Sequence, residues 1–140
     1  MLFRSGPVYQ AGTLSGNPLA TAAGLAVLGE LDAGAYARLE RTATRLADGM
    51  TGAFAAAGVP AQVTRVGTLV GWFLASEPVR DYEGAKAADH DGYARIFHGL
   101  LDRGIYTAPS GYEAMFPSLA HTDEDIDAVV AAFGDALAAG

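Results

Sequence analysis

The sequence predicts an α+β fold in which helices pack on a small antiparallel sheet. Three observations carry this prediction: several segments repeat apolar residues at helical spacing, two adjacent β-rich runs are joined by a short turn, and the composition supports a core. The 140 residues are 51% hydrophobic and 18% charged. That size and balance are typical of one globular domain.

The first predicted helix follows an irregular segment, residues 1–16, that is rich in Gly, Pro, Ser and Tyr. Asn17 is a favoured N-cap, and Pro18 suits the first helical position, where its missing N–H costs nothing. Residues 19–28 are almost all apolar or small. This helix, over residues 17–31, is therefore expected to be enclosed on most sides.

A second helix is predicted over residues 35–57, because apolar residues there follow the spacing of a single stripe. Glycine and proline directly after it end the helix. The β-rich runs at 61–66 and 69–75 are joined through a Gly-Thr pair and indicate an antiparallel hairpin. Residues 76–89 are polar and are expected to form a loop.

Two further helices complete the prediction. One covers residues 91–103 with an apolar face, and a short third strand is expected after it at residues 105–107. A loop over 109–118 leads to the last helix, which Thr122 opens ahead of acidic residues that complement the helix dipole. Its buried face is expected to hold Ile126, Val129, Val130, Phe133 and Leu137.

Composition excludes several classes of function. The formal charge of −7 and the scattered arginines argue against a nucleic-acid partner. The absence of cysteine excludes disulfides, thiolate metal sites and cysteine nucleophiles, and it accords with a reducing cytosol. No apolar run approaches the roughly 18 residues of a membrane span. We therefore expect a soluble, cytoplasmic protein with no membrane partner.

Few isolated residues suggest chemistry. The histidines lack the spacing of metal ligands, so no metal is expected; His98 should pack on its helix and His121 should neighbour the cap of the last helix. The acidic residues 123–125 are typical of a dipole complement. Trp72 and Phe73 alternate across a strand, which favours core and interface roles.

The densest clue to chemistry is the run YQAGTLSGNP at residues 9–18, a turn rich in glycine and hydroxyl groups that leads straight into a helix. Free backbone N–H groups, the positive end of the helix dipole and the hydroxyls of Thr13 and Ser15 could all face one anion there. Taken alone, the same residues are more typical of a helix start that binds nothing.

The longer run YQAGTLSGNPLATAAGL, at residues 9–25, resembles the signature of the glutamate-1-semialdehyde 2,1-aminomutase family, pyridoxal-phosphate enzymes of the class-III aminotransferase group. A second stretch, FHGLLDRGIYTAPSGYEAMFPSLAHTDEDID at residues 97–127, is similar to the family's C-terminal stretch. Between them, VRDYEGAKAAD also fits. The resemblance covers the chain from about Gly6 to its end.

The resemblance implies the last third of an aspartate-aminotransferase-like fold. Residues 1–33 would end the large cofactor domain with the phosphate turn and first helix, and residues 34–140 would form the linking helix and the C-terminal small domain. Thr13, with Gly12 beside it, matches the residue that reaches across a homodimer to the phosphate of the partner's pyridoxal 5'-phosphate.

Two further positions gain a role from the same resemblance. Tyr9 would border the active site that receives Thr13. Glu113 matches an acidic residue of the substrate pocket, where it would orient the small-molecule substrate or an arginine. Without the resemblance, Glu113 would be interpreted as a solvated loop residue.

The chain departs from the family in its lysine. Its one lysine, Lys86, lies in the expected polar loop, whereas the family's Schiff-base lysine precedes the YQAGT motif. Pyridoxal-phosphate chemistry needs that amine. No catalytic residue is therefore expected in this chain, which resembles a fragment that is inactive alone and does not bind the cofactor covalently.

The implied function is to supply the phosphate turn and the small domain to an aminomutase, an isomerase that converts glutamate-1-semialdehyde to 5-aminolevulinate for tetrapyrrole (porphyrin) biosynthesis. The partners would be the rest of the parent enzyme, a second copy and the substrate. Two alternatives stay open: another class-III aminotransferase acting on a different amine, and a non-catalytic association domain that has kept the small-domain fold.

Overall fold

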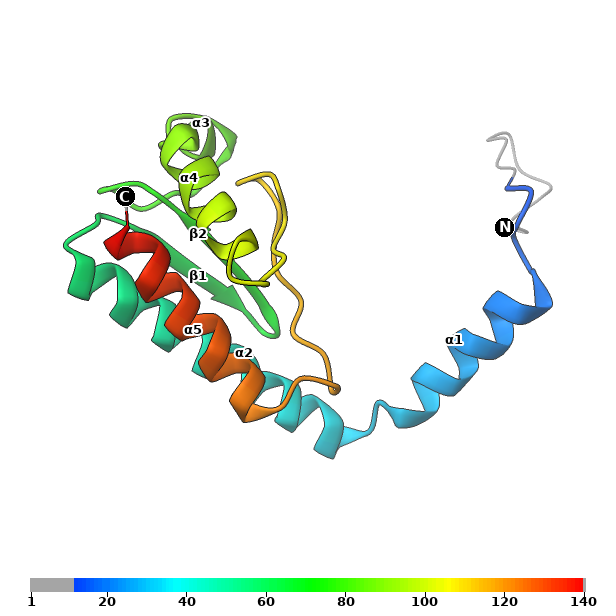
Figure 1. The fold of residues 1–140 in the computed structure, drawn as a ribbon. Coiled ribbons are helices and arrows are strands. Elements are labelled where there is room, and N and C mark those ends of the chain that lie inside the picture. The colour runs from blue at the N-terminus through cyan, green and yellow to red at the C-terminus, as the bar shows by residue number, and fades with distance from the viewer. Residues whose placement is uncertain (1–11, 140) are drawn as a thin grey trace. The chain divides into compact units, whose positions relative to one another are not determined.

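The computed structural model describes residues 12–139. Its elements are α1 (Pro18–Glu30), α2 (Ala33–Ala57), β1 (Gln62–Val66), β2 (Leu69–Phe73), α3 (Tyr82–Lys86), α4 (His90–Leu101) and α5 (Asp123–Ala138), as Figure 1 shows. The predicted class, helices with a small antiparallel sheet, is confirmed. The chain divides into two compact units, Met1–Ala35 and Tyr36–Gly140.

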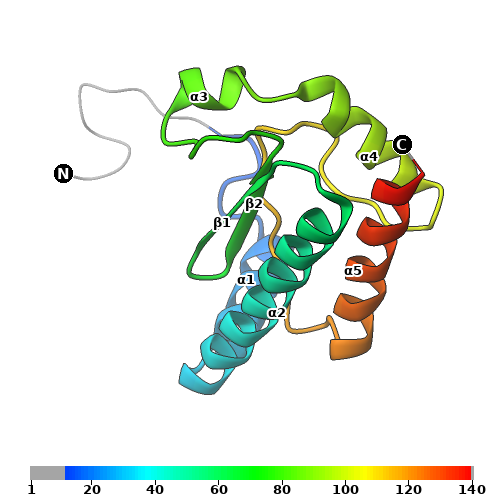
Figure 2. The same cartoon turned by 90° about the vertical axis from the view of Figure 1, so that its left-hand side faces the viewer.

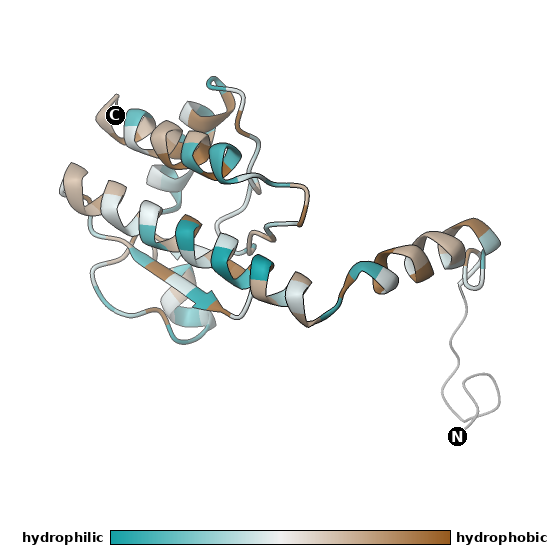
Figure 3. Cartoon of the chain, turned by 90° about the horizontal axis from the view of Figure 1, so that it is seen from below, coloured by the Kyte–Doolittle hydropathy of each residue, from teal (hydrophilic) through white to brown (hydrophobic). Residues whose placement is uncertain are grey.

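Helix α1 is the main element of the first unit. It begins at the predicted residue, but none of its residues is buried within the described chain. Leu19, Leu25 and Leu28 are between 66% and 79% exposed, and Figure 3 shows α1 coloured as hydrophobic along most of its length. The described residues do not supply the neighbours that this apolar helix was expected to need, so its enclosure stays a prediction.

The core of the second unit gathers around Trp72 on one face of the hairpin. The strands pair antiparallel with Val63 opposite Trp72. The Trp72 ring lies 5.5 Å from those of Phe54 on α2 and Phe133 on α5, and it stacks on Tyr93 of α4 at 4.3 Å. Three helices therefore converge on one strand residue. Other buried apolar side chains are Leu46, Met50, Val70, Leu74, Ile96, Leu100 and Ile126.

Helices α2 and α5 lie beside each other in the views of Figures 1 and 2, and they approach closely at Gly49. A Cβ atom added to Gly49 would lie 2.9 Å from Cγ1 and 3.3 Å from Cβ of Val130. Four residues before Gly49, the Arg45 guanidinium donates to both carboxylate oxygens of Asp127, at 2.8 and 2.7 Å. A close backbone approach and an exposed ion pair thus join these two helices.

One predicted loop contains a helix. The expected polar loop 76–89 includes α3, which Asp81 begins by accepting a hydrogen bond from the Gly84 N–H at 2.9 Å. Glu83 in the first turn and Lys86 in the last turn suit the helix dipole. The helix is too short for apolar periodicity to reveal it, so only the capping pattern signals it.

The third strand expected at residues 105–107 is absent from the described chain. Ile105 instead donates its N–H to the Leu100 carbonyl at 2.9 Å and thereby closes the C-terminus of α4. The free edge of β2 pairs with Met115, whose N–H lies 2.7 Å from the Val70 carbonyl oxygen. Capping of α4 therefore uses the Ile105 N–H, which a strand would have needed for pairing.

Candidate functional site

The candidate site residues fall in separate units. Gly12 and Thr13 lie in the first unit and Glu113 lies in the second. Tyr9 lies outside the described residues. The turn at Gly12 and Thr13 and the Glu113 pocket are therefore two local structures, each with its own geometry.

The turn over residues 12–17 is held by its own backbone. The Ser15 N–H donates to the Gly12 carbonyl at 3.0 Å, and the Asn17 N–H donates to the Leu14 carbonyl at 3.1 Å. A Cβ atom added to Gly12 would lie 2.6 Å from the Ser15 Oγ. Glycine at this position therefore leaves space for the Ser15 hydroxyl, and a larger residue would displace it.

The start of α1 differs from the expected anion site in one respect. The Asn17 side-chain oxygen accepts from the N–H groups of Leu19 and Ala20, at 2.9 and 3.2 Å. Pro18 has no N–H to offer. Because the cap already uses these helix amides, an anion would depend on the turn that precedes the helix.

Several donors of the turn have no acceptor among residues 12–139. The N–H groups of Thr13, Leu14 and Gly16 and the hydroxyls of Thr13 and Ser15 form no hydrogen bond with another described residue. All four residues are exposed. These donors suit phosphate oxygens, which accept hydrogen bonds from backbone amides and hydroxyls, so the residues present fit the phosphate of pyridoxal phosphate.

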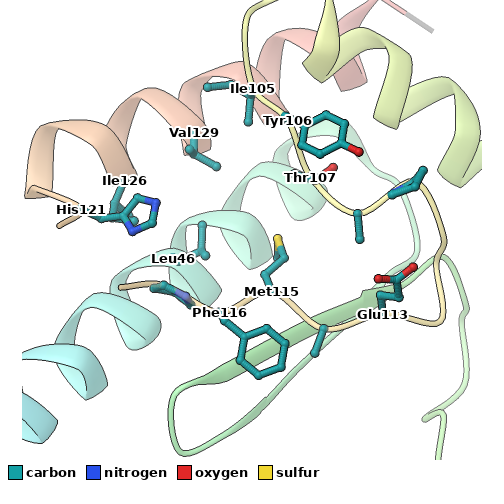
Figure 4. Close-up of a pocket in the computed structure, with 14 residues that line it drawn as sticks. Leu46, Ile105, Tyr106, Thr107, Glu113, Met115, Phe116, His121, Ile126 and Val129 are labelled. Atoms are coloured by element: carbon teal, nitrogen blue, oxygen red, sulfur yellow. The ribbon is translucent and has the colours of Figure 1, made fainter. Parts of the chain in front are cut away.

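The second local structure is a pocket of about 470 Å³ in the second unit. It lies between the loop that follows α4 and the facing sides of α2 and α5, and Figure 4 shows its lining side chains. Most of the lining is apolar, and the polar side chains are those of Tyr106, Thr107, Glu113 and His121. A mostly apolar cavity with few polar groups is the usual form of a small-molecule site.

Glu113 lies in the view of Figure 4 at the opposite end of the lining from His121. Its side chain is exposed, and its N–H donates to the Ser110 carbonyl at 3.2 Å. Burial and, to a smaller degree, the negative charge of Glu113 raise the pKa of the Tyr93 hydroxyl. The Glu113 carboxylate is therefore accessible to solvent and also close enough to the buried Tyr93 hydroxyl to affect its pKa.

Two pocket residues were missed by the sequence analysis. The Thr107 hydroxyl is buried and has no hydrogen-bond partner among residues 12–139, so it could bind a water molecule or a ligand atom. His121 lines the pocket as well as lying beside the cap of α5, where its Nδ1 accepts from the Ser118 N–H at 3.0 Å. Both residues sit within the family-like stretch 97–127, which is the one signal that could have identified them.

The remaining candidates have structural roles or none. The last helix begins with a capping box in which Thr122 and Asp125 bond each other, and these bonds lower the pKa of the Asp125 carboxyl. His98 is exposed, but its ring packs edge-on against that of Phe97 on the same helix, with centroids 5.3 Å apart, so the expected packing on its helix is confirmed. Lys86 is exposed at the end of α3.

Within the described part of the chain, no three histidine or acidic side chains gather in a way that could hold a metal ion. None of the helices described here is long and apolar enough to cross a membrane.

Comparison with known proteins supplies the family context. The model of the class-III aminotransferases matches residues 2–137. The chain is 52% identical over 134 residues to a glutamate-1-semialdehyde 2,1-aminomutase of Thermus thermophilus, and 50% identical over 134 residues to one of Roseiflexus castenholzii. These alignments cover 94% and 95% of this chain but 31% of each relative.

Solved structures show the same similarity in three dimensions. An omega-transaminase from Sphaerobacter thermophilus superposes with a TM-score of 0.78 at 27% identity, covering 94% of this chain and 30% of that one. A glutamate-1-semialdehyde-aminomutase from Pseudomonas aeruginosa PAO1 also gives 0.78, at 26% identity, covering 98% and 31%. The chain therefore spans about 30% of the length of these structural relatives and shares their fold over that part.

Proposed function

Since this chain belongs to the class-III aminotransferases, we propose that it is the C-terminal portion of a glutamate-1-semialdehyde 2,1-aminomutase. The observation that carries the proposal is the identity of about half of its residues with the aminomutases of Thermus thermophilus and Roseiflexus castenholzii. The whole enzyme would convert glutamate-1-semialdehyde to 5-aminolevulinate in the cytoplasm, for tetrapyrrole biosynthesis. This chain would contribute the phosphate turn and the small domain.

The cofactor of that enzyme would be pyridoxal 5'-phosphate, which supplies an electron sink for moving an amine between carbon atoms. The turn at Gly12 and Thr13 would hold its phosphate. The Thr13 hydroxyl and the N–H groups of Thr13, Leu14 and Gly16 would donate to the phosphate oxygens, and Gly12 would leave room for the Ser15 hydroxyl. The turn would thereby fix the position of the cofactor relative to the substrate.

We place this contact across a homodimer, with Thr13 of one subunit bound to the phosphate in the other. Thr13→Val keeps the branched shape and removes the hydroxyl. The loss of one hydrogen bond to a charged group costs about 1.5 to 3 kcal/mol, which is about ten- to a hundredfold in cofactor affinity. Thr21→Val is the matched control, because the Thr21 hydroxyl bonds the Asn17 carbonyl at 2.9 Å within α1.

Mixed dimers test whether Thr13 of one subunit serves the site of the other subunit. In a dimer of Thr13→Val with a subunit lacking the Schiff-base lysine, the trans arrangement leaves one complete site. A dimer of wild type with the double mutant then leaves none. Retention of a complete site in that second dimer would show that Thr13 serves its own subunit.

The pocket next to Glu113 would receive the substrate. Glu113 would orient the substrate or an arginine of the remaining enzyme, and Tyr9 would border the same site. The apolar lining would exclude water from that part of the pocket. Lys86, exposed at the end of α3, is the only amine side chain in the sequence, so the chain alone would be inactive.

The decisive experiment is a chimera in which this chain replaces the matching part of the Thermus thermophilus relative. We expect conversion of glutamate-1-semialdehyde to 5-aminolevulinate without an added amino donor. A chimera that transfers amines only when an external donor is present would favour another class-III aminotransferase, which the equally similar omega-transaminase fold keeps open. A folded chimera without either activity would favour a non-catalytic association domain.

A further inference from the structure

The loop that carries Glu113 is attached to α4 at several points. Its first attachment is Tyr93, whose hydroxyl donates to the Ala108 carbonyl at 2.7 Å. Tyr93 is only 7% exposed and stacks on Trp72 at the centre of the core. The hydrogen bond therefore ties the beginning of the loop to a side chain that cannot easily move.

The same ring also shapes the backbone just before Glu113. A Cβ atom added to Gly111 would lie 3.1 Å from Cδ2 and 3.3 Å from Cγ of Tyr93. Gly111 is buried. The Gly111 backbone, two residues before Glu113, thus packs directly on the Tyr93 ring. A side chain at position 111 would push this backbone away from the ring.

A second α4 residue, His90, contacts Tyr112, which lies between Gly111 and Glu113. The Tyr112 ring stacks on His90 with centroids 4.9 Å apart, and on Tyr82 of α3 at 6.0 Å. The His90 Nε2 lies 3.1 Å from the Ala85 carbonyl oxygen, which links that ring to α3 in turn. His90 and Tyr93 are three residues apart and so lie on one side of α4.

The far end of the loop is fixed by the sheet. The Met115 N–H donates to the Val70 carbonyl at 2.7 Å, and the Val70 N–H donates back to Met115 at 3.1 Å. Glu113 is therefore flanked on both sides by anchored residues although its own side chain is exposed. Of these anchors, Tyr93 is the one that makes both a hydrogen bond and a packing contact with the loop.

We propose that Tyr93 is a positioning residue: its hydroxyl and ring hold the loop 108–115 in the conformation that presents Glu113 to the substrate pocket. The use of Glu113 toward substrate rests on the proposed function, whereas the effect of Tyr93 on the loop does not. The raised pKa of Tyr93, to which the Glu113 charge contributes after burial, accords with the two groups being close.

The first test measures the loop in the 140-residue chain by amide hydrogen exchange. Tyr93→Phe removes the bond to Ala108 and keeps the ring, so exchange at the Glu113 amide should accelerate about two- to tenfold relative to the amides of α2. Gly111→Ala should accelerate the same amide by a different route, by pushing the backbone off the ring. Tyr36→Phe is the matched control, since Tyr36 is 55% exposed and far along the chain from the loop.

Faster exchange at Glu113 in both variants, with unchanged α2 amides, supports the proposal. Unchanged exchange at Glu113 in Tyr93→Phe overturns it. Equal acceleration throughout the second unit also overturns it, because Tyr93 would then stabilise the fold as a whole and not the loop.

The second test is a double-mutant cycle in the active chimera. Tyr93→Phe should lower kcat/KM about two- to tenfold when Glu113 is present and have no effect in the Glu113→Gln background. Equal losses in the two backgrounds would overturn the positioning role. If Glu113→Gln alone leaves kcat/KM unchanged, the proposed role of Glu113 is wrong and so is the link to substrate, while the exchange experiment still decides whether Tyr93 holds the loop.

Discussion

The contact between α2 and α5 makes a sharp prediction for two glycines on the same helix. Gly49 and Gly52 both lie within α2, where alanine is ordinarily about 1 kcal/mol more favourable than glycine. A Cβ atom at Gly52 meets nothing within 4 Å. At Gly49 it would meet three side-chain atoms of Val130, including Cγ1 at 2.9 Å. The same substitution should therefore have opposite effects.

The magnitude follows from the two terms. Gly52→Ala should raise the free energy of unfolding by about 0.5 to 1 kcal/mol through helix propensity alone. Gly49→Ala gains the same term, but inserting a methyl group into a packed contact costs typically about 1 to 3 kcal/mol. Val130 is β-branched and has one strongly preferred helical rotamer, so it cannot rotate away freely. The two terms together give a net loss of up to about 2.5 kcal/mol.

Urea unfolding followed by far-ultraviolet circular dichroism measures both changes. The midpoint should rise in Gly52→Ala and fall in Gly49→Ala, with the slope unchanged in each. Adding Val130→Ala to Gly49→Ala should recover stability relative to Val130→Ala alone, because the methyl group then fills the space left by valine. Stabilisation of Gly49→Ala equal to that of Gly52→Ala would refute the close approach of the two helices.

Three other predictions concern pH, association and the lysine. Hydrogen bonds from Thr122 lower the pKa of the Asp125 carboxyl, so they stabilise the fold above the ordinary carboxyl pKa and this stabilisation is lost as the pH falls through the lowered pKa. The urea midpoint of the wild type should therefore fall below about pH 4, and it should fall less steeply in Asp125→Asn. An equally steep fall in the variant would contradict this. The exposed apolar side chains of α1 should make the chain self-associate. The double variant Leu25→Glu, Leu28→Glu should then sediment more as a monomer than the wild type does. A wild-type chain that stays monomeric at all concentrations would oppose this. Borohydride treatment in the presence of pyridoxal phosphate should give no stoichiometric, site-specific adduct at the exposed Lys86, and the chain should show no turnover. A tryptic peptide map that finds such an adduct, together with activity, would contradict the proposal that the chain alone is inactive.

Much of the fold could be predicted because apolar residues recur at helical spacing along each long amphipathic helix. The apolar stripe predicted a helix at 35–57, and α2 spans Ala33–Ala57; Thr122 was predicted to open the last helix and does cap α5. Helix α3 could not be found this way, since five residues hold barely more than one turn. The apolar composition of α1 shows that this helix needs a covering surface, but composition does not reveal which surface that is.

The candidate site shows a different limit. The glycine- and hydroxyl-rich turn was visible as a possible anion site, but the sequence did not show that Asn17 occupies the first helix amides. Glu113 gained significance through family resemblance alone, since an acidic residue in a loop has no periodic or spacing signal. Thr107 was assigned to a strand, and its buried, unpartnered hydroxyl depends on how the loop after α4 folds back.

The convergence of three helices on Trp72 gives this chain a built-in optical reporter. Trp72 is the single tryptophan in the sequence and is 4% exposed. Its emission should therefore be blue-shifted while the second unit is folded and move toward the red when α2, α4 or α5 separates from the hairpin. Because Tyr93 stacks on the indole and also bonds the Ala108 carbonyl, a ligand that moves the Glu113 loop should change this emission without any added dye. Tryptophan fluorescence could thus detect binding at the pocket without an activity assay.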